Sequence, residues 1–388
     1  MSTSAETDRA ARHPDMPRIG TRYRDWRLNG PYDAVVIGSG MGGLSTAVCL
    51  SALGWKVAVL EQHYTAGGYT HSYEREGYEW DVGLHYVGDM QEGGQSRRVM
   101  DFLTGGQVQW ASLGPVYDRF KVGNETYDAP TGWRAWRDAM VQRFPQEANA
   151  IDRYVALLKR VGKAMPMLTM VRVLPAGARR WLQPLAMRLL PSAFRQTTAQ
   201  VLDSLTDNVQ LKGVLAAQWG DYGLPPSASS FLAHAIVTSH FMNGGYYPVG
   251  GSWRLAQAML PQIRATGGDV FTYARVAEIL VEDGQTRGVR MSDGTRIECA
   301  CVVSGAGATN TFGRLLAPEV AQRSGYADKL KQVQPSGAHL GVYIGLKQTA
   351  EALGLPKTNL WVYPGPDHDG QNARHMADVE QPFPVVYL

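Results

Sequence analysis

Three glycines spaced as G-x-G-x-x-G stand at residues 38, 40 and 43, and an acid, Glu61, follows them. Glycine at the first position permits a tight turn, and at the second it lets a phosphate approach the backbone. At the third it lets a helix pack closely on a strand. A carboxylate about twenty residues later can accept both hydroxyls of a ribose. The pattern predicts a dinucleotide-binding site.

The segments around these residues have the periodicity that such a site requires. An apolar, β-branched run at 34–37 predicts a buried parallel strand before the first glycine. Apolar positions from 44 to 53 predict a helix, and 57–60 predicts a second strand that ends at Glu61. The helix N-terminus offers free N–H groups and a positive dipole end to phosphates. Glycine clusters also form ordinary turns, but here strand, glycines, helix, strand and acid are in register.

Two features favour FAD over a nicotinamide dinucleotide. The acid is Glu rather than Asp, and the pair Gly67-Gly68 follows it, which gives the backbone another close approach to a long, bent cofactor. The expected cofactor-binding residues are Gly38, Ser39, Gly40, Met41, Gly42, Gly43, Glu61, Gln62, Gly67 and Gly68.

The rest of the chain predicts a second sheet and a group of helices. A hairpin is expected with its turn near Glu76-Gly77, strands over 107–128, and helices over 131–215. Turn signals at Asp283-Gly284 and Asp293-Gly294 predict a three-stranded meander. A strand over 302–307, ending in small residues, would then return the chain to the first sheet, beside its first strand.

The expected fold class is α/β, with a discontinuous Rossmann-like FAD-binding domain and a substrate domain made of a mixed sheet and helices. The predicted boundaries are a disordered tail over 1–30, the FAD-binding domain over 31–106 and 250–333, and the substrate domain over 107–249 and 334–388. Alternation at 339–347 predicts a further strand of the second sheet. The apolar run 384–388 is a poor place for a chain to stop, so we expect this chain to be incomplete.

Residues 153–202 carry nine basic side chains and no acidic ones, whereas the whole chain has a formal net charge of +3. Met, Leu and Trp stand between these charges. Contact with an anionic membrane surface is one interpretation, and a solvated helical cap with an apolar core side is the other. Pro175, Pro184 and Pro191 are expected to break any long helix. The expected location is cytoplasmic, with peripheral membrane association.

Several motifs together resemble the phytoene desaturase family of flavoproteins, in its retinol saturase and carotenoid isomerase branch. They are VVIGSGMGGLSTA from Val35, LEQH with AGG and DVGLHYVG from Leu60, YYPVGGS from Tyr246, and the meander that follows. The resemblance implies a monoamine-oxidase-like fold, FAD with NAD(P)H as a candidate electron donor, and an adenine held by the backbone of Val276. Such relatives carry a later glycine-rich strand–helix segment, and none follows residue 312 here.

The resemblance also implies saturation, desaturation or isomerisation of double bonds in a long apolar isoprenoid. Hydride transfer is the flavin's own chemistry, so saturation requires from the protein a proton donor. His85, Tyr86 and Tyr247 are the candidate catalytic residues, although for each residue alone a hydrogen-bonded core position is the stronger interpretation.

Two alternatives remain open from the sequence. One is an FAD oxidase of the same fold that acts on amines or porphyrinogens. The other is a non-redox carrier of prenyl chains that resembles Rab GDP-dissociation inhibitor, against which Glu61 and the second glycine pair argue. We expect neither a nucleic-acid partner nor a metal site.

Overall fold

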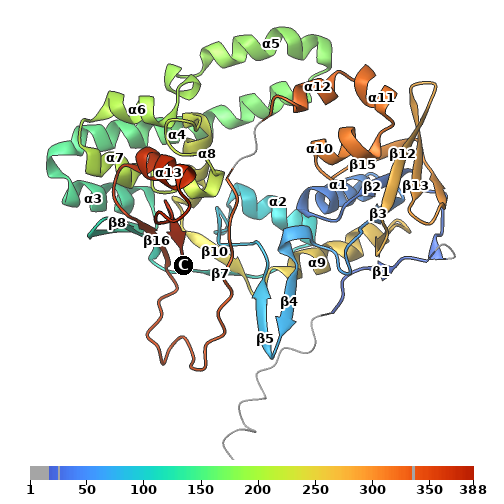
Figure 1. Cartoon of the computed structure of the whole chain (residues 1–388), viewed down its shortest axis with the longest axis horizontal. Helices are drawn as coiled ribbons and strands as arrows, with labels where there is room; N and C mark the ends of the chain where they lie inside the picture. Colours follow the sequence, from blue (N-terminus) through green and yellow to red (C-terminus); the bar gives the residue numbers. More distant parts are fainter. Residues whose placement is uncertain (1–16, 25–26, 334–336) are drawn as a thin grey trace, which may run out of the picture.

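A five-stranded parallel sheet organises one half of the computed structural model, which describes residues 17–24, 27–333 and 337–388 (Figure 1). Its order is β1-β11-β3-β2-β15, and all neighbouring strands are parallel. The central strands β2 and β3 are buried along their whole length. The bounds are Thr21–Arg22 for β1, Ala34–Ile37 for β2, Val57–Leu60 for β3, Asp269–Thr272 for β11 and Cys301–Ser304 for β15.

The predicted return of the chain to its first sheet is confirmed, because Val302 in β15 pairs with Val35 in β2. The sheet therefore takes strands from two stretches of chain that are about 200 residues apart. The domain boundaries predicted from the sequence stay a prediction.

Alternate residues of the central strands enter two different cores. Val36 and Val59 face the helices α1 (Met41–Ala52), α2 (Gln95–Thr104) and α9 (Trp253–Arg264). Val35 and Leu60 face the opposite way and contact the predicted meander. Its strands are β12 (Val276–Glu282), β13 (Gln285–Met291) and β14 (Arg296–Glu298).

The tail predicted for residues 1–30 is wrong for part of its length. Residues 1–16 and 25–26 lie outside the described residues, but β1 pairs with β11 through Thr21 and Arg22. Ile19 is buried, and its N–H donates to Thr65 Oγ1 at 3.0 Å. Two residues cover the open edge of β11, and so short a strand has no periodicity that a sequence pattern could reveal.

The other half contains a mixed sheet of order β17-β16-β8-β9 and two smaller strand groups. The predicted turn at Glu76 and Gly77 is confirmed, since both have positive φ. The bounds are β4 Ser72–Arg75 and β5 Tyr78–Asp81 in the hairpin; β6 Val87–Gly88, β7 Trp110–Ser112 and β10 Gly245–Pro248 in the small sheet; and β8 Val116–Val122, β9 Glu125–Pro130, β16 Asn359–Tyr363 and β17 Val386–Tyr387 in the mixed sheet.

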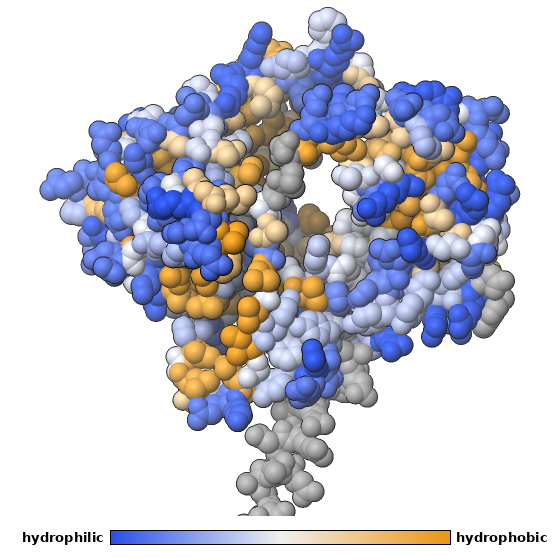
Figure 2. Space-filling model, viewed as in Figure 1, coloured by the Kyte–Doolittle hydropathy of each residue, from blue (hydrophilic) through white to orange (hydrophobic). Residues whose placement is uncertain are grey.

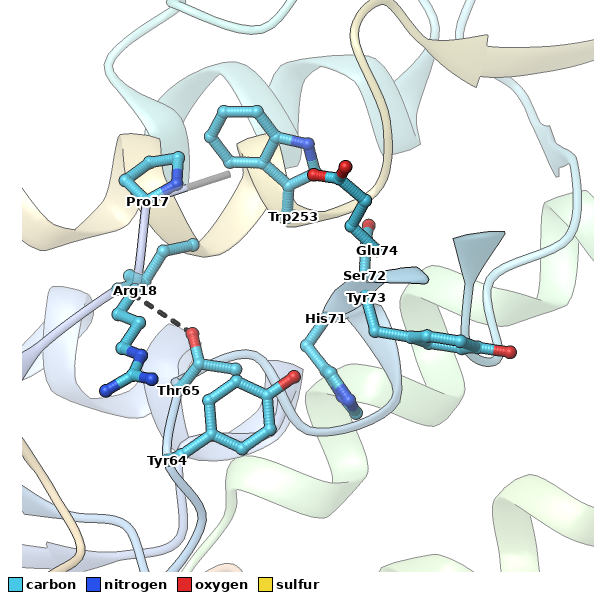
Figure 3. Close-up of a pocket in the computed structure, with 10 residues that line it drawn as sticks. Pro17, Arg18, Tyr64, Thr65, His71, Ser72, Tyr73, Glu74 and Trp253 are labelled. Carbon is cyan, nitrogen blue, oxygen red and sulfur yellow. Dashed lines mark hydrogen bonds between the residues drawn. The ribbon is translucent and has the colours of Figure 1, made fainter. Parts of the chain in front are cut away.

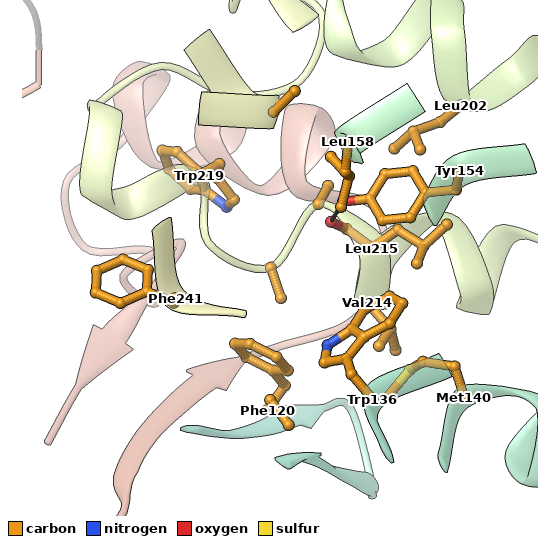
Figure 4. Close-up of a cluster of buried hydrophobic side chains, with 14 of the residues drawn as sticks. Phe120, Trp136, Met140, Tyr154, Leu158, Leu202, Val214, Leu215, Trp219 and Phe241 are labelled. Carbon is orange, nitrogen blue, oxygen red and sulfur yellow. Dashed lines mark hydrogen bonds between the residues drawn. The ribbon is translucent and has the colours of Figure 1, made fainter. Parts of the chain in front are cut away.

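Helices cover the mixed sheet on the side away from the parallel sheet (Figure 1). Their shared core holds Trp136, Tyr154, Leu158, Val214 and Phe241 (Figure 4). The bounds are α3 Trp133–Arg143, α4 Ala148–Val173, α5 Ala176–Leu189, α6 Thr198–Leu205, α7 Val209–Leu215 and α8 Phe231–Phe241, with α10 Ala308–Asn310, α11 Pro318–Arg323, α12 Tyr326–Leu330 and α13 His368–Ala377 later in the chain.

One strand prediction near the end of the sequence needs correction. Residues 339–347 form no strand, because their anchors are side chains: Tyr343 packs against Trp80, and its hydroxyl donates to Val82 O at 2.7 Å. The strand of the second sheet is instead β16, which is parallel to β8. The apolar run at 384–388 supplies β17, which pairs with β16.

The prolines interrupt the helices less than predicted. Pro175 does separate α4 from α5, and Pro191 follows α5, but Pro184 lies inside α5, as Pro166 lies inside α4. An internal proline removes one helix hydrogen bond, and around Pro184 the helix is largely exposed, so water can satisfy the freed carbonyl group.

A buried histidine joins three helical segments of the second half. His234 in α8 lies with Nε2 2.7 Å from the Tyr154 hydroxyl and Nδ1 3.0 Å from the Tyr222 hydroxyl. Tyr154 in turn donates to Leu215 O at 3.2 Å. Complete burial lowers the pKa of His234 to about 3, so the imidazole is neutral in the folded protein.

This histidine makes folding sensitive to acid. Below its unfolded pKa of about 6.5 the unfolded chain binds a proton that the folded chain rejects, so stability falls as pH decreases. For His234 alone the loss is about 2 kcal/mol at pH 5. We expect His234→Gln to reduce the difference in free energy of unfolding between pH 7 and pH 5, measured with urea. An unchanged pH dependence would show that the histidine is charged when folded.

Candidate functional site

The turn from β2 into α1 depends on two glycines that touch. Gly38 has φ of 90°, a conformation that glycine adopts without strain, and its N–H donates to Leu60 O at 2.8 Å. A Cβ on Gly43 would lie 2.1 Å from the Gly38 carbonyl oxygen. Only hydrogen fits there, so this contact sets how closely α1 approaches the sheet.

The space beside the start of α1 is open. A Cβ added to Gly40 or Gly42 would meet nothing within 4 Å among the described residues. Gly40 is the N-cap of α1 and provides no side chain that could bond the N–H groups of the first helical turn. These N–H groups therefore face the open space, together with the positive end of the helix dipole. Met41, the first helical residue, is half-buried beneath it. The arrangement fits a pyrophosphate.

The second glycine pair lies against the first motif. Gly67 N–H donates to Ser39 O at 3.1 Å, and a backbone bridge joins Gly67 to Gly40. A Cβ on Gly68 would stand 2.8 Å from the Gly40 Cα. The structure thus brings both predicted glycine segments to one place, which we call the glycine cradle.

Glu61 is held at the edge of this cradle by three donors. Its Oε2 accepts from the Ser39 N–H at 2.8 Å and the Ser39 hydroxyl at 2.7 Å, and its Oε1 accepts from the His63 N–H at 2.8 Å. Only 8% of the residue is exposed, whereas Gln62 beside it is exposed. These bonds orient a carboxylate acceptor, and the sequence did not reveal the role of the Ser39 side chain.

Val276 also lies near this acid. Two residues before it, Ala274 N–H donates to Glu61 O at 2.7 Å, and Tyr273 N–H donates to His63 O at 2.9 Å. Val276 is buried at the start of β12. Its proposed role toward an adenine stays a prediction.

A separate small pocket lies beside the turn that follows Gly67 (Figure 3). It has a volume of about 190 Å³ and is lined by Arg18, Tyr64, His71 and Trp253, among others. His71 Nδ1 donates to Gly68 O at 2.6 Å. The cradle glycines do not line this pocket.

Of the three candidate proton donors, Tyr247 and Tyr86 have hydroxyl groups that bond carboxylates, the half-buried Asp81 and the buried Asp118. Tyr247 bonds Asp81, which also accepts the Ser252 N–H at 3.1 Å. Burial, and then Asp81, raises the pKa of Tyr247. Tyr86 donates to Asp118 Oδ2 at 2.7 Å, and its pKa is raised by burial first and Asp118 second. Both phenols tie strands together.

His85 is placed differently, since 46% of its side chain is exposed. Its Nδ1 lies 2.8 Å from Tyr86 O, and burial of part of the ring lowers its pKa. A Cβ on Gly83 would lie 3.0 Å from the side chain of Tyr69, so this segment runs alongside the loop that contains Gly68. Of the three candidates, His85 is therefore the one with an exposed side chain, in a segment that approaches the loop of Gly68 through Gly83.

Sequence reasoning missed the two acids behind these residues. Asp118 in β8 accepts from Tyr86, from Gln218 Nε2 at 3.1 Å and from Asn359 Nδ2 at 3.1 Å. Burial nevertheless raises its pKa to about 6. Asp221 lies with Oδ1 3.8 Å from His85 Nε2. The available signal was weak: single acids within otherwise aromatic or alternating stretches.

Comparison with known proteins identifies the family and the relatives of this chain. Residues 41–342 match the family described as flavin containing amine oxidoreductase. The chain is 37% identical over 357 residues to all-trans-retinol 13,14-reductase from Homo sapiens, across 89% of this chain and 58% of that protein. It is 24% identical over 324 residues to prolycopene isomerase 2 from an Oncidium hybrid cultivar, across 81% of this chain and 55% of that protein. These matches confirm the resemblance, and the chain spans little more than half the length of these relatives.

A solved structure of a putrescine oxidase variant aligns with a TM-score of 0.54 at 20% identity, across 79% of this chain and 64% of that one. At this identity the likeness concerns the fold, and it confirms the predicted α/β class.

Two alanine variants distinguish an effect on FAD binding from an effect on the stability of the fold. Gly40→Ala is expected to fold normally, because its Cβ enters open space, yet to bind FAD at least about tenfold more weakly, equivalent to about 1.4 kcal/mol. Gly43→Ala is expected to lose about 1–3 kcal/mol of stability through overpacking. Thermal unfolding and equilibrium dialysis with FAD measure the two effects. Wild-type FAD affinity in Gly40→Ala would contradict the cradle assignment.

Proposed function

The chain belongs to the flavin containing amine oxidoreductase family, and on this premise we propose that it is an FAD-dependent oxidoreductase acting on carbon–carbon double bonds of a long apolar isoprenoid. The observation that supports FAD as the cofactor is the open cradle at Gly40 and Gly42 with Glu61 at its edge. The substrate class is supported by the retinol- and lycopene-related names of the relatives.

Each part of the cradle would contact a different part of FAD. The N–H groups from Met41 to Gly43 would hold the pyrophosphate, Glu61 would accept the ribose hydroxyls, and the Val276 backbone would contact the adenine. When bound, the flavin supplies hydride chemistry.

The chain's own residues would orient the substrate and supply a proton. Beside His85 stand the rings of Tyr86, Phe241 and Tyr387, with centroids 5.3, 6.4 and 6.3 Å from the imidazole. Such a wall favours a flat, apolar polyene over a charged amine. His85, half exposed at the end of this wall, is the proposed proton donor.

Anaerobic spectroscopy with FAD-loaded protein distinguishes the possible reactions. Reoxidation of pre-reduced flavin by all-trans-retinol or a carotenoid indicates saturation, and bleaching of oxidised flavin by the same polyene indicates desaturation. Isomerisation changes the polyene geometry without net redox, which chromatography detects. Adding NADPH without polyene tests whether a nicotinamide reduces the flavin.

We expect the polyene, and not putrescine, to change the redox state of the flavin or the geometry of the polyene. Gly40→Ala at equal protein concentration should lose most of the response because it lacks the cofactor. Bleaching by the amine alone would favour an amine oxidase and contradict the isoprenoid proposal.

We further propose that α4 and α5 contact a membrane surface. The end of α4 and most of α5 expose apolar side chains: Met170 is 68% exposed, Val173 77%, Trp181 79% and Leu189 71%. Exposed arginines at 172, 179, 180 and 188 stand among them. These apolar side chains are thus not core, which favours the membrane interpretation over a solvated cap.

A groove lies between α2 and the exposed end of α4. It has a volume of about 530 Å³ and is lined by Gln95 of α2 and by Met165, Thr169 and Met170 of α4, among others. Figure 2 shows the molecule hollowed between its two halves. An apolar substrate leaving a bilayer could follow this groove. Among the described residues no helix has the length and hydropathy needed to cross a bilayer.

Liposome flotation tests the membrane contact. Wild type should float with anionic vesicles and less well at high salt, because basic residues near such a surface contribute about 1 kcal/mol each. Replacing Trp181 and Leu185 by Ser should reduce flotation, whereas Leu53→Ser, at a site 75% exposed directly after α1, should not. Equal recovery of all three proteins would rule out the α5 surface.

A further inference from the structure

We propose that Asp221 is the proton store of this site and reprotonates His85, the proposed proton donor. The inference deepens the proposed function and rests on it. Asp221 does not touch the cradle itself, so its role is that of a positioning residue that acts through His85.

The placement of Asp221 is the first argument. It lies in a short 3₁₀ turn, Trp219–Tyr222, directly before the segment that leads to α8. Its side chain is 8% exposed, and Oδ1 lies 3.8 Å from His85 Nε2. The other oxygen, Oδ2, is buried and has no hydrogen-bond partner among the described residues. A buried carboxylate with an unpaired oxygen is costly, so the neutral acid is the stable form.

A comparison with Asp118 gives the second argument. Three donors surround Asp118 and stabilise its charge, while Asp221 Oδ2 has no hydrogen-bond partner among the described residues. Burial, and then the charge of Asp118, raises the pKa of Asp221 to about 8. Two carboxyl groups with such different environments take different protonation states. The other ionisable groups that interact electrostatically with Asp221 are the imidazole of His85 and five phenols, those of Tyr86, Tyr117, Tyr222, Tyr363 and Tyr387. His339 in turn interacts electrostatically with His85.

The state of His85 gives the third argument. Its Nδ1 must carry a proton, because the neighbouring Tyr86 oxygen is a carbonyl that can only accept. Its lowered pKa leaves Nε2 unprotonated at neutral pH, with the lone pair toward Asp221. Neutral His85 therefore has no proton to give from Nε2 until an acid supplies one.

The resulting step is balanced. The Asp221 O–H bond breaks and an Nε2–H bond forms, which leaves a carboxylate and an imidazolium. The half-exposed imidazolium would then give this proton to one alkene carbon of the substrate, and the hydride for the other carbon is the chemistry that a reduced flavin would supply when bound. Asp221 recovers its proton from solvent, and His85 returns to neutral.

Titration of the protein without added flavin tests the proton store separately from the proposed function. Between about pH 4 and pH 8 folded Asp221 holds a proton that the unfolded chain has lost, so its contribution to stability declines as pH rises. In Asp221→Asn this decline is absent. We expect the melting temperature of the variant relative to wild type to rise by about a few degrees from pH 5 to pH 8. The exposed control Asp203→Asn should keep a constant offset.

Two measurements on wild type avoid dependence on a variant. The infrared carbonyl stretch of a protonated carboxylic acid should be present at pH 7, where Asp118 is largely ionised, and lost by pH 9, and the ¹⁵N resonance of His85 Nε2 should respond over the same range. A constant offset for Asp221→Asn, or the absence of both titrations, overturns the inference even if the protein binds FAD. Both titrations in a protein that cannot bind FAD would overturn the proposed function instead.

Discussion

A single backbone contact, between the Gly43 Cα and the Gly38 carbonyl, underlies the rest of the site. With 2.1 Å between that oxygen and a hypothetical Cβ, any side chain would push α1 away from β2. The helix N-terminus would then miss the space above Gly40, and the loop with Gly67 could no longer bridge to it. The bonds from Ser39 to Glu61 depend on the same turn, so phosphate and ribose recognition share one geometric origin.

The predictions from sequence succeed where the determinants are local. The β2–α1–β3 unit, the hairpin turn at Glu76 and the meander each depend on residues close together in the chain, and their glycine signals are strong. Long-range pairing is harder to predict. The alternation at 339–347 is as strand-like as that of β16, and only the tertiary environment decides which one joins β8. The edge strand β1 has just two residues.

The acids near His85 show the same limit at the level of chemistry. Asp118 and Asp221 stand about a hundred residues apart, and neither belongs to a recognisable motif. What distinguishes them is the number of donors around each carboxyl group, a property of the packed core between α8 and the mixed sheet. His85 could be singled out from its glycine-flanked segment, but its partner could not.

Because the parallel sheet is assembled from distant stretches of the chain, it cannot be completed until late in synthesis. Strand β3 ends at Leu60, but its neighbour β11 begins at Asp269 and β15 ends at Ser304. At about 5–20 residues per second, a ribosome needs roughly 10–50 s to deliver these partners. Throughout that interval both edges of the β2–β3 pair lack the strands that later cover them, and closing so long a loop slows folding further. The length of the insert between β3 and β11 therefore sets how long the nascent chain depends on protection from aggregation.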